Sequence, residues 1–138
     1  MSSNQFDSKV LQLVNNERAN VGLDSLSIDN QLDRAANLHT DEMVRADQMS
    51  HQLPGEASLG DRVSATGYQW SSVGENVAAG YSTPEDVVEG WMNSVGHREN
   101  ILNPNFTHLG VGYSNNPDND NSYSDQDIYW TQVFASEF

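Results

Sequence analysis

Cysteine is absent from this sequence of 138 residues, and lysine is nearly so, since Lys9 is the only one. The lack of thiols excludes disulfide bonds, thiol catalysis and thiolate metal sites, so any bound metal must take histidine, carboxylate or carbonyl ligands. Long apolar runs are also missing, and no stretch reaches the length of a transmembrane helix. No secretory signal follows Met1, and we expect that a signal or anchor precedes this segment in the full-length protein.

Basic residues are also few in this sequence. Acidic residues outnumber them by 20 to 6, which gives a net charge of −14. Such a chain cannot neutralise phosphates, so nucleic acid is excluded as a partner and an anionic membrane surface is disfavoured. The composition fits salty or calcium-rich surroundings and fits an ordinary acidic secreted domain equally well. Melting the protein across a NaCl series separates the two, because a salt-adapted protein must gain stability with salt.

The length predicts a single domain over residues 1–138, without internal repeats or linkers. Apolar residues recur at helical spacing in residues 5–19, after the cap residue Asp29, and from Pro84 onward. Strands are predicted for residues 73–81, 109–113 and 128–135. Three short strands cannot bury both faces of their sheet without helices on each side. The expected fold is therefore α+β, a three-layer α-β-α sandwich with a small, mainly antiparallel sheet.

The helix that begins at Pro84 has the clearest signals. Thr83 can cap it and Pro84 occupies its first position. Gly96 is expected to end it in the left-handed conformation. His97 would then follow the helix C-terminus, where the dipole favours an imidazolium.

Two smaller features complete the local predictions. Residues 59–65 should form one or two helical turns, with a local ion pair between Asp61 and Arg62. Gly110 and Gly112 lie in a predicted strand, where they allow another backbone to approach closely.

The titratable residues with the clearest chemical use are His51, Glu75 and His97, with His39 and Tyr129 as candidate supporting groups. Two imidazoles and a carboxylate can hold zinc, or can serve as a general base with its orienting acid. The same residues can equally form a polar network that joins layers of the fold. Glu75 lies in an apolar segment and must be paired if it is buried. His39 lies on the buried face of its helix, which favours a core role.

An acidic loop is predicted for residues 115–127. Asp118 and Asp120 alternate there with polar residues, as oxygen ligands of calcium sometimes do. The spacing of an EF-hand is not met, and a simple acidic hairpin loop is the better interpretation.

Six segments in order resemble the CAP superfamily, which comprises cysteine-rich secretory proteins, antigen 5 and pathogenesis-related 1 proteins and is also called SCP-like. They cover nearly the whole chain, and they are residues 13–18 (LVNNER), 49–51 (MSH), 74–78 (GENVA), 91–104 (WMNSVGHRENILNP), 110–113 (GVGY) and 129–135 (YWTQVFA). The helix motif with its histidine indicates a prokaryotic member. The absence of cysteine departs from the animal members, which disulfides stabilise.

The resemblance implies an α-β-α sandwich with a central cleft, where animal and plant members place two histidines and two glutamates that can bind a divalent metal. His51 matches the first of these histidines and Glu75 the first glutamate. Ser94 stands at the second glutamate and Tyr129 at the second histidine, so half of the set is missing. We expect His97 to restore a second imidazole to the cleft.

Taken together, these observations predict a secreted or cell-envelope binding module. Its cleft of His51, Glu75 and His97, with Ser94 and Tyr129, would hold a divalent cation such as zinc or a small polar ligand. Its partner would be a small ligand or an extracellular protein. One alternative is a metal-dependent, peptidase-like hydrolase with Glu75 as the base. Another is a purely structural module that presents its acidic surface to a partner.

Overall fold

The computed structural model describes residues 3–115 and 128–138. Within these ranges the chain forms five helices and four strands. In chain order they are α1 (Ser3–Asn20), β1 (Ser27–Ile28), α2 (Asn30–Ala46), α3 (Leu59–Ala65), β2 (Trp70–Ala79), α4 (Pro84–Met92), α5 (Val95–Ile101), β3 (His108–Asn115) and β4 (Ile128–Glu137). The three predicted strands are confirmed, and the short β1 is an addition to them.

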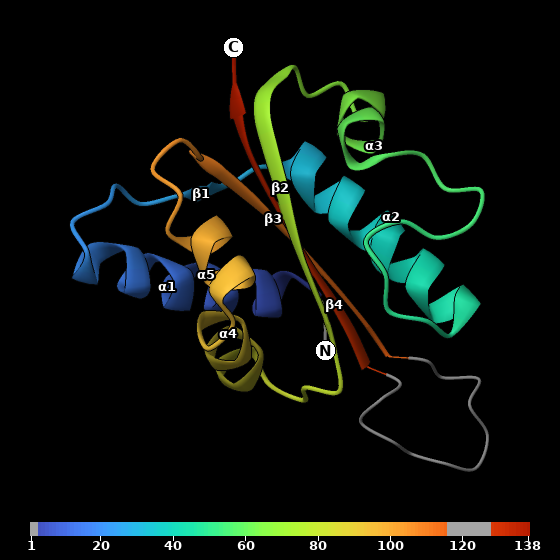
Figure 1. The fold of residues 1–138 in the computed structure, drawn as a ribbon, viewed down its shortest axis with the longest axis horizontal. Helices are drawn as coiled ribbons and strands as arrows, with labels where there is room; N and C mark the ends of the chain where they lie inside the picture. The colour runs from blue at the N-terminus through green and yellow to red at the C-terminus, as the bar shows by residue number, and fades with distance from the viewer. Residues whose placement is uncertain (1–2, 116–127) are drawn as a thin grey trace.

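The sheet has the strand order β1-β3-β4-β2. β1 pairs with β3 in parallel, whereas β4 is antiparallel to both β3 and β2. Helices α1, α4 and α5 cover one face of the sheet, and α2 and α3 cover the other (Figure 1). The predicted α-β-α sandwich is therefore confirmed. β2 lies at one edge of the sheet, between the two helical layers.

Two helix starts follow the predicted capping chemistry. The Asp29 carboxylate accepts hydrogen bonds from the amides of Gln31 and Leu32, and the Thr83 hydroxyl accepts one from the amide of Asp86. Each cap satisfies amides that have no partner inside the helix.

The predicted end of the fourth helix is wrong. α4 stops at Met92, Asn93 caps it, and a second helix begins at Val95. Gly96 is helical rather than left-handed, because the helix is interrupted before it reaches this residue. His97 therefore lies in the first turn of α5 and not beyond a helix C-terminus. The dipole at that position opposes an imidazolium, which reverses the electrostatic prediction.

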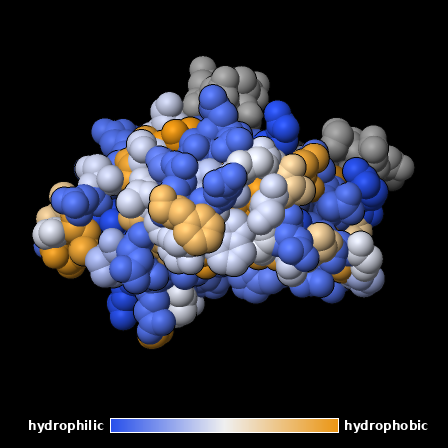
Figure 2. All heavy atoms as spheres, turned by 90° about the horizontal axis from the view of Figure 1, so that it is seen from above, coloured by the Kyte–Doolittle hydropathy of each residue, from blue (hydrophilic) through white to orange (hydrophobic). Residues whose placement is uncertain are grey.

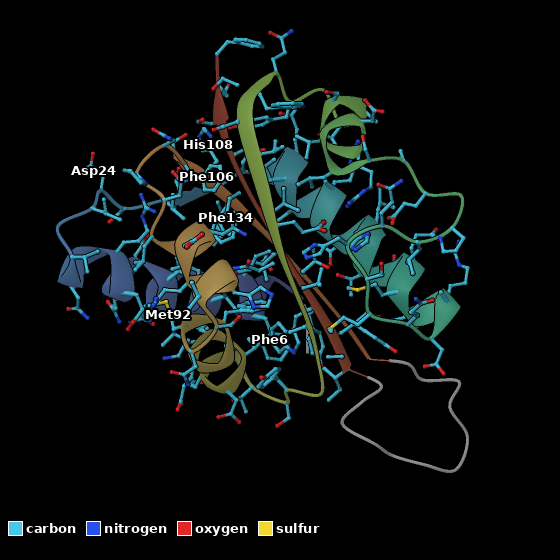
Figure 3. The ribbon with its side chains drawn as sticks, in the orientation of Figure 1. Phe6, Asp24, Met92, Phe106, His108 and Phe134 are labelled. Carbon is cyan, nitrogen blue, oxygen red and sulfur yellow. The ribbon has the colours of Figure 1, made fainter. Side chains whose placement is uncertain are left out.

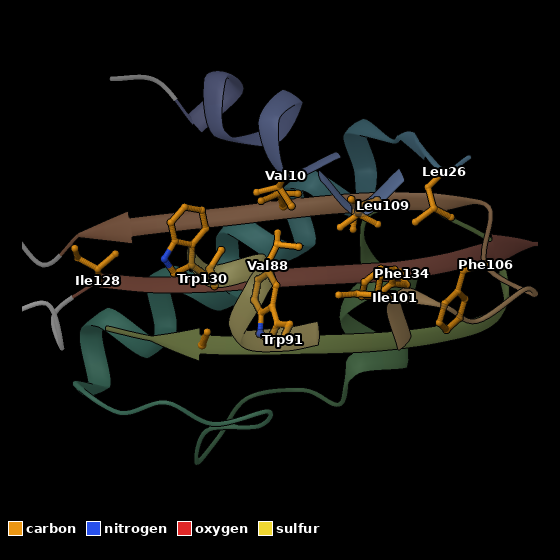
Figure 4. Close-up of a cluster of buried hydrophobic side chains, with 14 residues drawn as sticks. Val10, Leu26, Val88, Trp91, Ile101, Phe106, Leu109, Ile128, Trp130 and Phe134 are labelled. Atoms are coloured by element: carbon orange, nitrogen blue, oxygen red, sulfur yellow. The ribbon is translucent and has the colours of Figure 1, made fainter. Parts of the chain in front are cut away.

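The core has a part on each face of the sheet. The larger cluster packs Trp91, Val88 and Ile101 from the helices against Trp130 and Phe134 of β4 (Figure 4). Phe134 also stacks with Phe106, with ring centroids 5.5 Å apart; both are labelled in Figure 3.

On the other face, α2 packs directly onto the backbone of β3. A Cβ at Gly110 would lie 2.1 Å from the backbone of Leu32, and one at Gly112 would lie 2.4 Å from the carbonyl of Ala36. The predicted close approach of two backbones is confirmed.

Hydrophilic side chains dominate the face shown in Figure 2, where apolar side chains reach the surface only in separate places. None of the described helices combines the length and apolar character that a membrane crossing requires.

Candidate functional site

His51 is the exposed end of a buried hydrogen-bond network. It lies in the loop that follows α2, where Asp47 adopts a left-handed backbone (φ 52°) and ends the helix. The His51 side chain is 62% exposed. Its Nδ1 donates to Oε1 of Glu75 at 2.9 Å, so this carboxylate orients the ring and leaves Nε2 available.

Glu75 lies on β2, and its side chain is only 2% exposed. Its second oxygen, Oε2, accepts a hydrogen bond of 2.9 Å from the guanidinium of Arg62 on α3. The prediction that a buried Glu75 must be paired is therefore confirmed.

Arg62 joins three segments through one planar group. It also donates to the carbonyls of Ala57 and His51, at 3.0 and 2.9 Å. The predicted ion pair with Asp61 is wrong, because the guanidinium points to Glu75 instead. Sequence reasoning missed this role, since 13 residues separate the two partners and only packing of α3 against β2 brings them together.

His39 and Glu56 extend the network into the core. His39 is fully buried; its Nδ1 lies 2.6 Å from Oε2 of Glu56, and its Nε2 lies 2.7 Å from the carbonyl of Ser50. Polar contacts at both ring nitrogens hold the His39 ring in one orientation. The predicted core role of His39 is confirmed, and Glu56 is a residue that sequence reasoning missed.

His97 approaches the same strand from the opposite face. Asn76 donates through Nδ2 to the carbonyl of His97 at 3.1 Å and to Oε1 of Gln132 at 3.1 Å. Asn100 donates to Oδ1 of Asn76 at 2.9 Å and to the carbonyl of Glu75 at 3.1 Å. This chain of amides fixes α5, and with it His97, against β2.

The imidazole of His97 is held in its neutral form. Burial lowers its pKa, and the nearby charge of His51 lowers it further. At neutral pH the ring therefore offers one N–H donor and one nitrogen acceptor.

A pocket of about 240 Å³ lies beside His97 at the edge of β2. Trp91, Ser94 and His97 form one wall, and Met49, from the loop that precedes His51, contributes to the other. Ser94 precedes α5 but makes no capping hydrogen bond with its side chain, so its hydroxyl is available to a ligand. The full lining is Met49, Val77, Ala78, Ala79, Tyr81, Gly90, Trp91, Ser94 and His97.

The other predicted site residues lie elsewhere. Tyr129 is buried with Met43, Leu53 and Val77, and its hydroxyl donates to Asp47 at 3.2 Å. Asp118 and Asp120 lie outside the described residues.

The donors near His51 do not fit a closed zinc site. Such a site takes four protein ligands, and even a catalytic one takes three. In residues 3–115 and 128–138 no group of three or more His, Cys, Asp or Glu side chains is placed to hold a metal ion. Glu75 is committed to Arg62 and His51; of the two imidazoles, His97 lines the pocket of about 240 Å³ and His51 does not.

Comparison with known proteins gives consistent matches. The profile of the cysteine-rich secretory protein family (CAP) matches residues 11–134. The Bacillus subtilis protein YkwD is 46% identical over 136 residues, which cover 99% of this chain and 49% of YkwD. The chain therefore spans about half the length of this relative.

Solved structures agree with the sequence matches. An extracellular protein containing an SCP domain from Bacillus anthracis superposes with a TM-score of 0.83 at 32% identity, over 97% of this chain and 41% of that one. An outer surface protein of Borrelia burgdorferi superposes with a TM-score of 0.87 over 100% of this chain and 97% of that one. Its identity is 17%, so it shows the shared fold alone.

Proposed function

Because this chain belongs to the cysteine-rich secretory protein (CAP) family, we propose that it is an extracellular binding module whose ligand sits between His51 and His97 at the edge of β2. The observation that carries this proposal is the buried Arg62–Glu75 ion pair, because Glu75 also accepts a hydrogen bond from the exposed imidazole of His51. The Bacillus anthracis protein, which is 32% identical to this chain, is described as extracellular, and this supports the location.

The energetics of the pair support a role beyond packing. Burying a carboxylate and a guanidinium costs several kcal/mol per ion, and pairing them only offsets this cost. The result of the arrangement is one defined ring orientation for His51, whose side chain is 62% exposed. A network that served only to join layers would not need to end in solvent.

The ligand that fits best is a small polar one. Nε2 of His51, the neutral ring of His97 and the hydroxyl of Ser94 offer both donors and acceptors. A divalent cation would have two imidazoles as protein ligands, so we expect it to bind weakly. Each Glu75 oxygen already accepts a hydrogen bond, and nothing in the described residues favours a hydrolase over a binding module.

Titration calorimetry with zinc, and then with imidazole-binding polar ligands, tests the site. The proteins are chelator-treated wild type, His51→Ala and His97→Ala. His108→Ala is the matched control, because His108 lies on β3 and its nearest polar partner is the hydroxyl of Tyr68.

Binding that weakens about tenfold or more in each site variant, and not in His108→Ala, is the expected result. Equal binding by all four proteins would refute the site. No binding of any probe would favour the structural alternative, in which the polar network only joins layers of the fold and the acidic surface meets the partner.

A further inference from the structure

The outer edge of β2, which faces away from β4, has unpaired backbone groups beside the pocket; Val77 on this edge is buried and Ala79 is half-buried. Residues of an antiparallel strand point their N–H and C=O groups alternately toward and away from the neighbouring strand. Gly80 donates to the carbonyl of Ile128, so the even-numbered residues of β2 face β4. Glu75, Val77 and Ala79 therefore direct their backbone groups away from the sheet.

Side chains from the helical layer cover part of this edge. Asn100 donates to the carbonyl of Glu75, and Nε1 of Trp91 donates to the carbonyl of Val77 at 3.1 Å. The N–H of Val77 and both backbone groups of Ala79 have no hydrogen-bond partner among the described residues. Folded proteins rarely leave such groups without water or a ligand, and they rarely leave a sheet edge open.

The free groups lie at the bottom of a groove with two walls. Both Val77 and Ala79 line the pocket, with Met49 on the α2 side and Trp91, Ser94 and His97 on the α4–α5 side. In Figure 1, β2 runs between α2 and α3 on one side and α1, α4 and α5 on the other. An added strand would fit this geometry, since its side chains alternate between the two walls.

We infer that the edge of β2 binds an extended peptide, which adds as a fifth strand through Val77 and Ala79 and fills the pocket with one side chain. The inference rests on the function proposed above in that the added strand would occupy the pocket on the His97 side of that site. An extended peptide matches an N–H at Val77 followed by an N–H and a C=O at Ala79, two residues apart on one edge.

The lining sets the chemistry of this peptide. The pocket contains no acidic or basic side chain apart from His97, whose lowered pKa keeps it neutral at neutral pH. Met49, half of which is exposed, offers an apolar contact on one side, and Ser94 offers a hydroxyl on the other. The net charge of −14 repels acidic segments. The peptide is therefore neutral in its centre, with alternating apolar and small polar side chains and with basic or neutral flanks.

Amide hydrogen exchange followed by NMR tests the inference without altering the protein. The probe is Ac-Lys-Thr-Val-Thr-Val-Thr-Lys-NH2 at millimolar concentration, because pairing through the backbone tolerates sequence. Two control peptides carry N-methyl groups, one on the valine amides and one on the threonine amides. Only one of these sets can face β2, so one control must lose its pairing.

The expected result is about tenfold slower exchange at Val77 and Ala79 with the parent peptide, and loss of that protection with at least one methylated peptide. The amides of Asn76 and Ala78, already bonded to β4, are internal controls whose exchange stays unchanged.

Three results would overturn the inference: no added protection at the two edge amides, equal binding of all three peptides, or protection that rises with protein concentration alone. The last would identify a second copy of this chain as the occupant. The zinc and small-ligand titrations test the His51–His97 site independently, so a failed peptide experiment does not refute that site.

Discussion

Replacing Arg62 tests whether the network of the candidate site is held by its buried ion pair. The Arg62 side chain is 10% exposed and that of Glu75 is 2% exposed, with 2.9 Å between nitrogen and oxygen. Removing one partner of a buried pair typically costs about 3–5 kcal/mol, because the other charge stays buried without compensation. The hydrogen bond from His51 to Glu75 remains in the variant, so we expect Arg62→Met to cost about 3 kcal/mol, the lower end of this range.

Urea denaturation at pH 7 measures this cost, and a double-mutant cycle separates the pair from simple packing. Glu75→Gln removes the charge that Arg62 compensates, so Arg62→Met combined with Glu75→Gln should be less destabilised than the sum of the single variants by about 2 kcal/mol. Arg45→Met is the matched control, because Arg45 is 71% exposed in its ion pair with Glu42. Such a surface pair contributes about 0–1 kcal/mol. A cost for Arg62→Met no larger than that of the control, or strict additivity in the cycle, would refute the reasoning.

Three further predictions concern residues away from the site. Burial, and the hydrogen bond and charge of Asp33, raise the pKa of Asp7 from 3.8 to about 8, so its contribution to stability is complete below pH 4 and is lost as the pH rises toward 8. Between pH 5 and 7.5 the unfolding free energy of wild type should fall by up to about 1.4 kcal/mol per pH unit, and that of Asp7→Asn should not. Urea denaturation measures both, and the same pH dependence in the two proteins would disprove the raised pKa. Gly110→Ala should lower stability by about 3 kcal/mol or prevent folding, because its Cβ would lie 2.1 Å from the backbone of Leu32; thermal melting decides, and an unchanged Tm would contradict the close packing. Arg18 is 1% exposed and its guanidinium binds four backbone carbonyls, so Arg18→Lys should cost about 2–3 kcal/mol in urea denaturation, whereas a cost below 1 kcal/mol would show that an ammonium replaces these bonds.

The parts of the site that could be predicted were those with a local signature or a family motif. Glu75 was singled out as a carboxylate within an apolar strand, and its burial and pairing follow from the cost of an unpaired charge. His51 was found because it matches a family histidine, and the structure places its ring beside Glu75. Glu56 and Arg62 had no such signal, because each lies in a polar stretch that reads as surface.

Local physical chemistry decided the elements of this fold. The caps at Asp29 and Thr83, the apolar spacing of the helices and the β-branched and aromatic run of β4 depend on neighbours within a few residues, so the sequence by itself determined them. It also determined that His97 would come soon after the helix that begins at Pro84.

Only the tertiary structure decided how His97 and the other site residues are placed. The break between α4 and α5 places His97 in the first turn of α5 and not beyond the last turn of α4. Gly96 has open space around it, so no local contact indicates whether it ends a helix or lies within one. The pairing of Arg62 with Glu75 and the unpaired backbone groups of Val77 and Ala79 depend on which strand lies outermost in the sheet. Strand order is a sum of many long-range contacts, and no single stretch of sequence contains it.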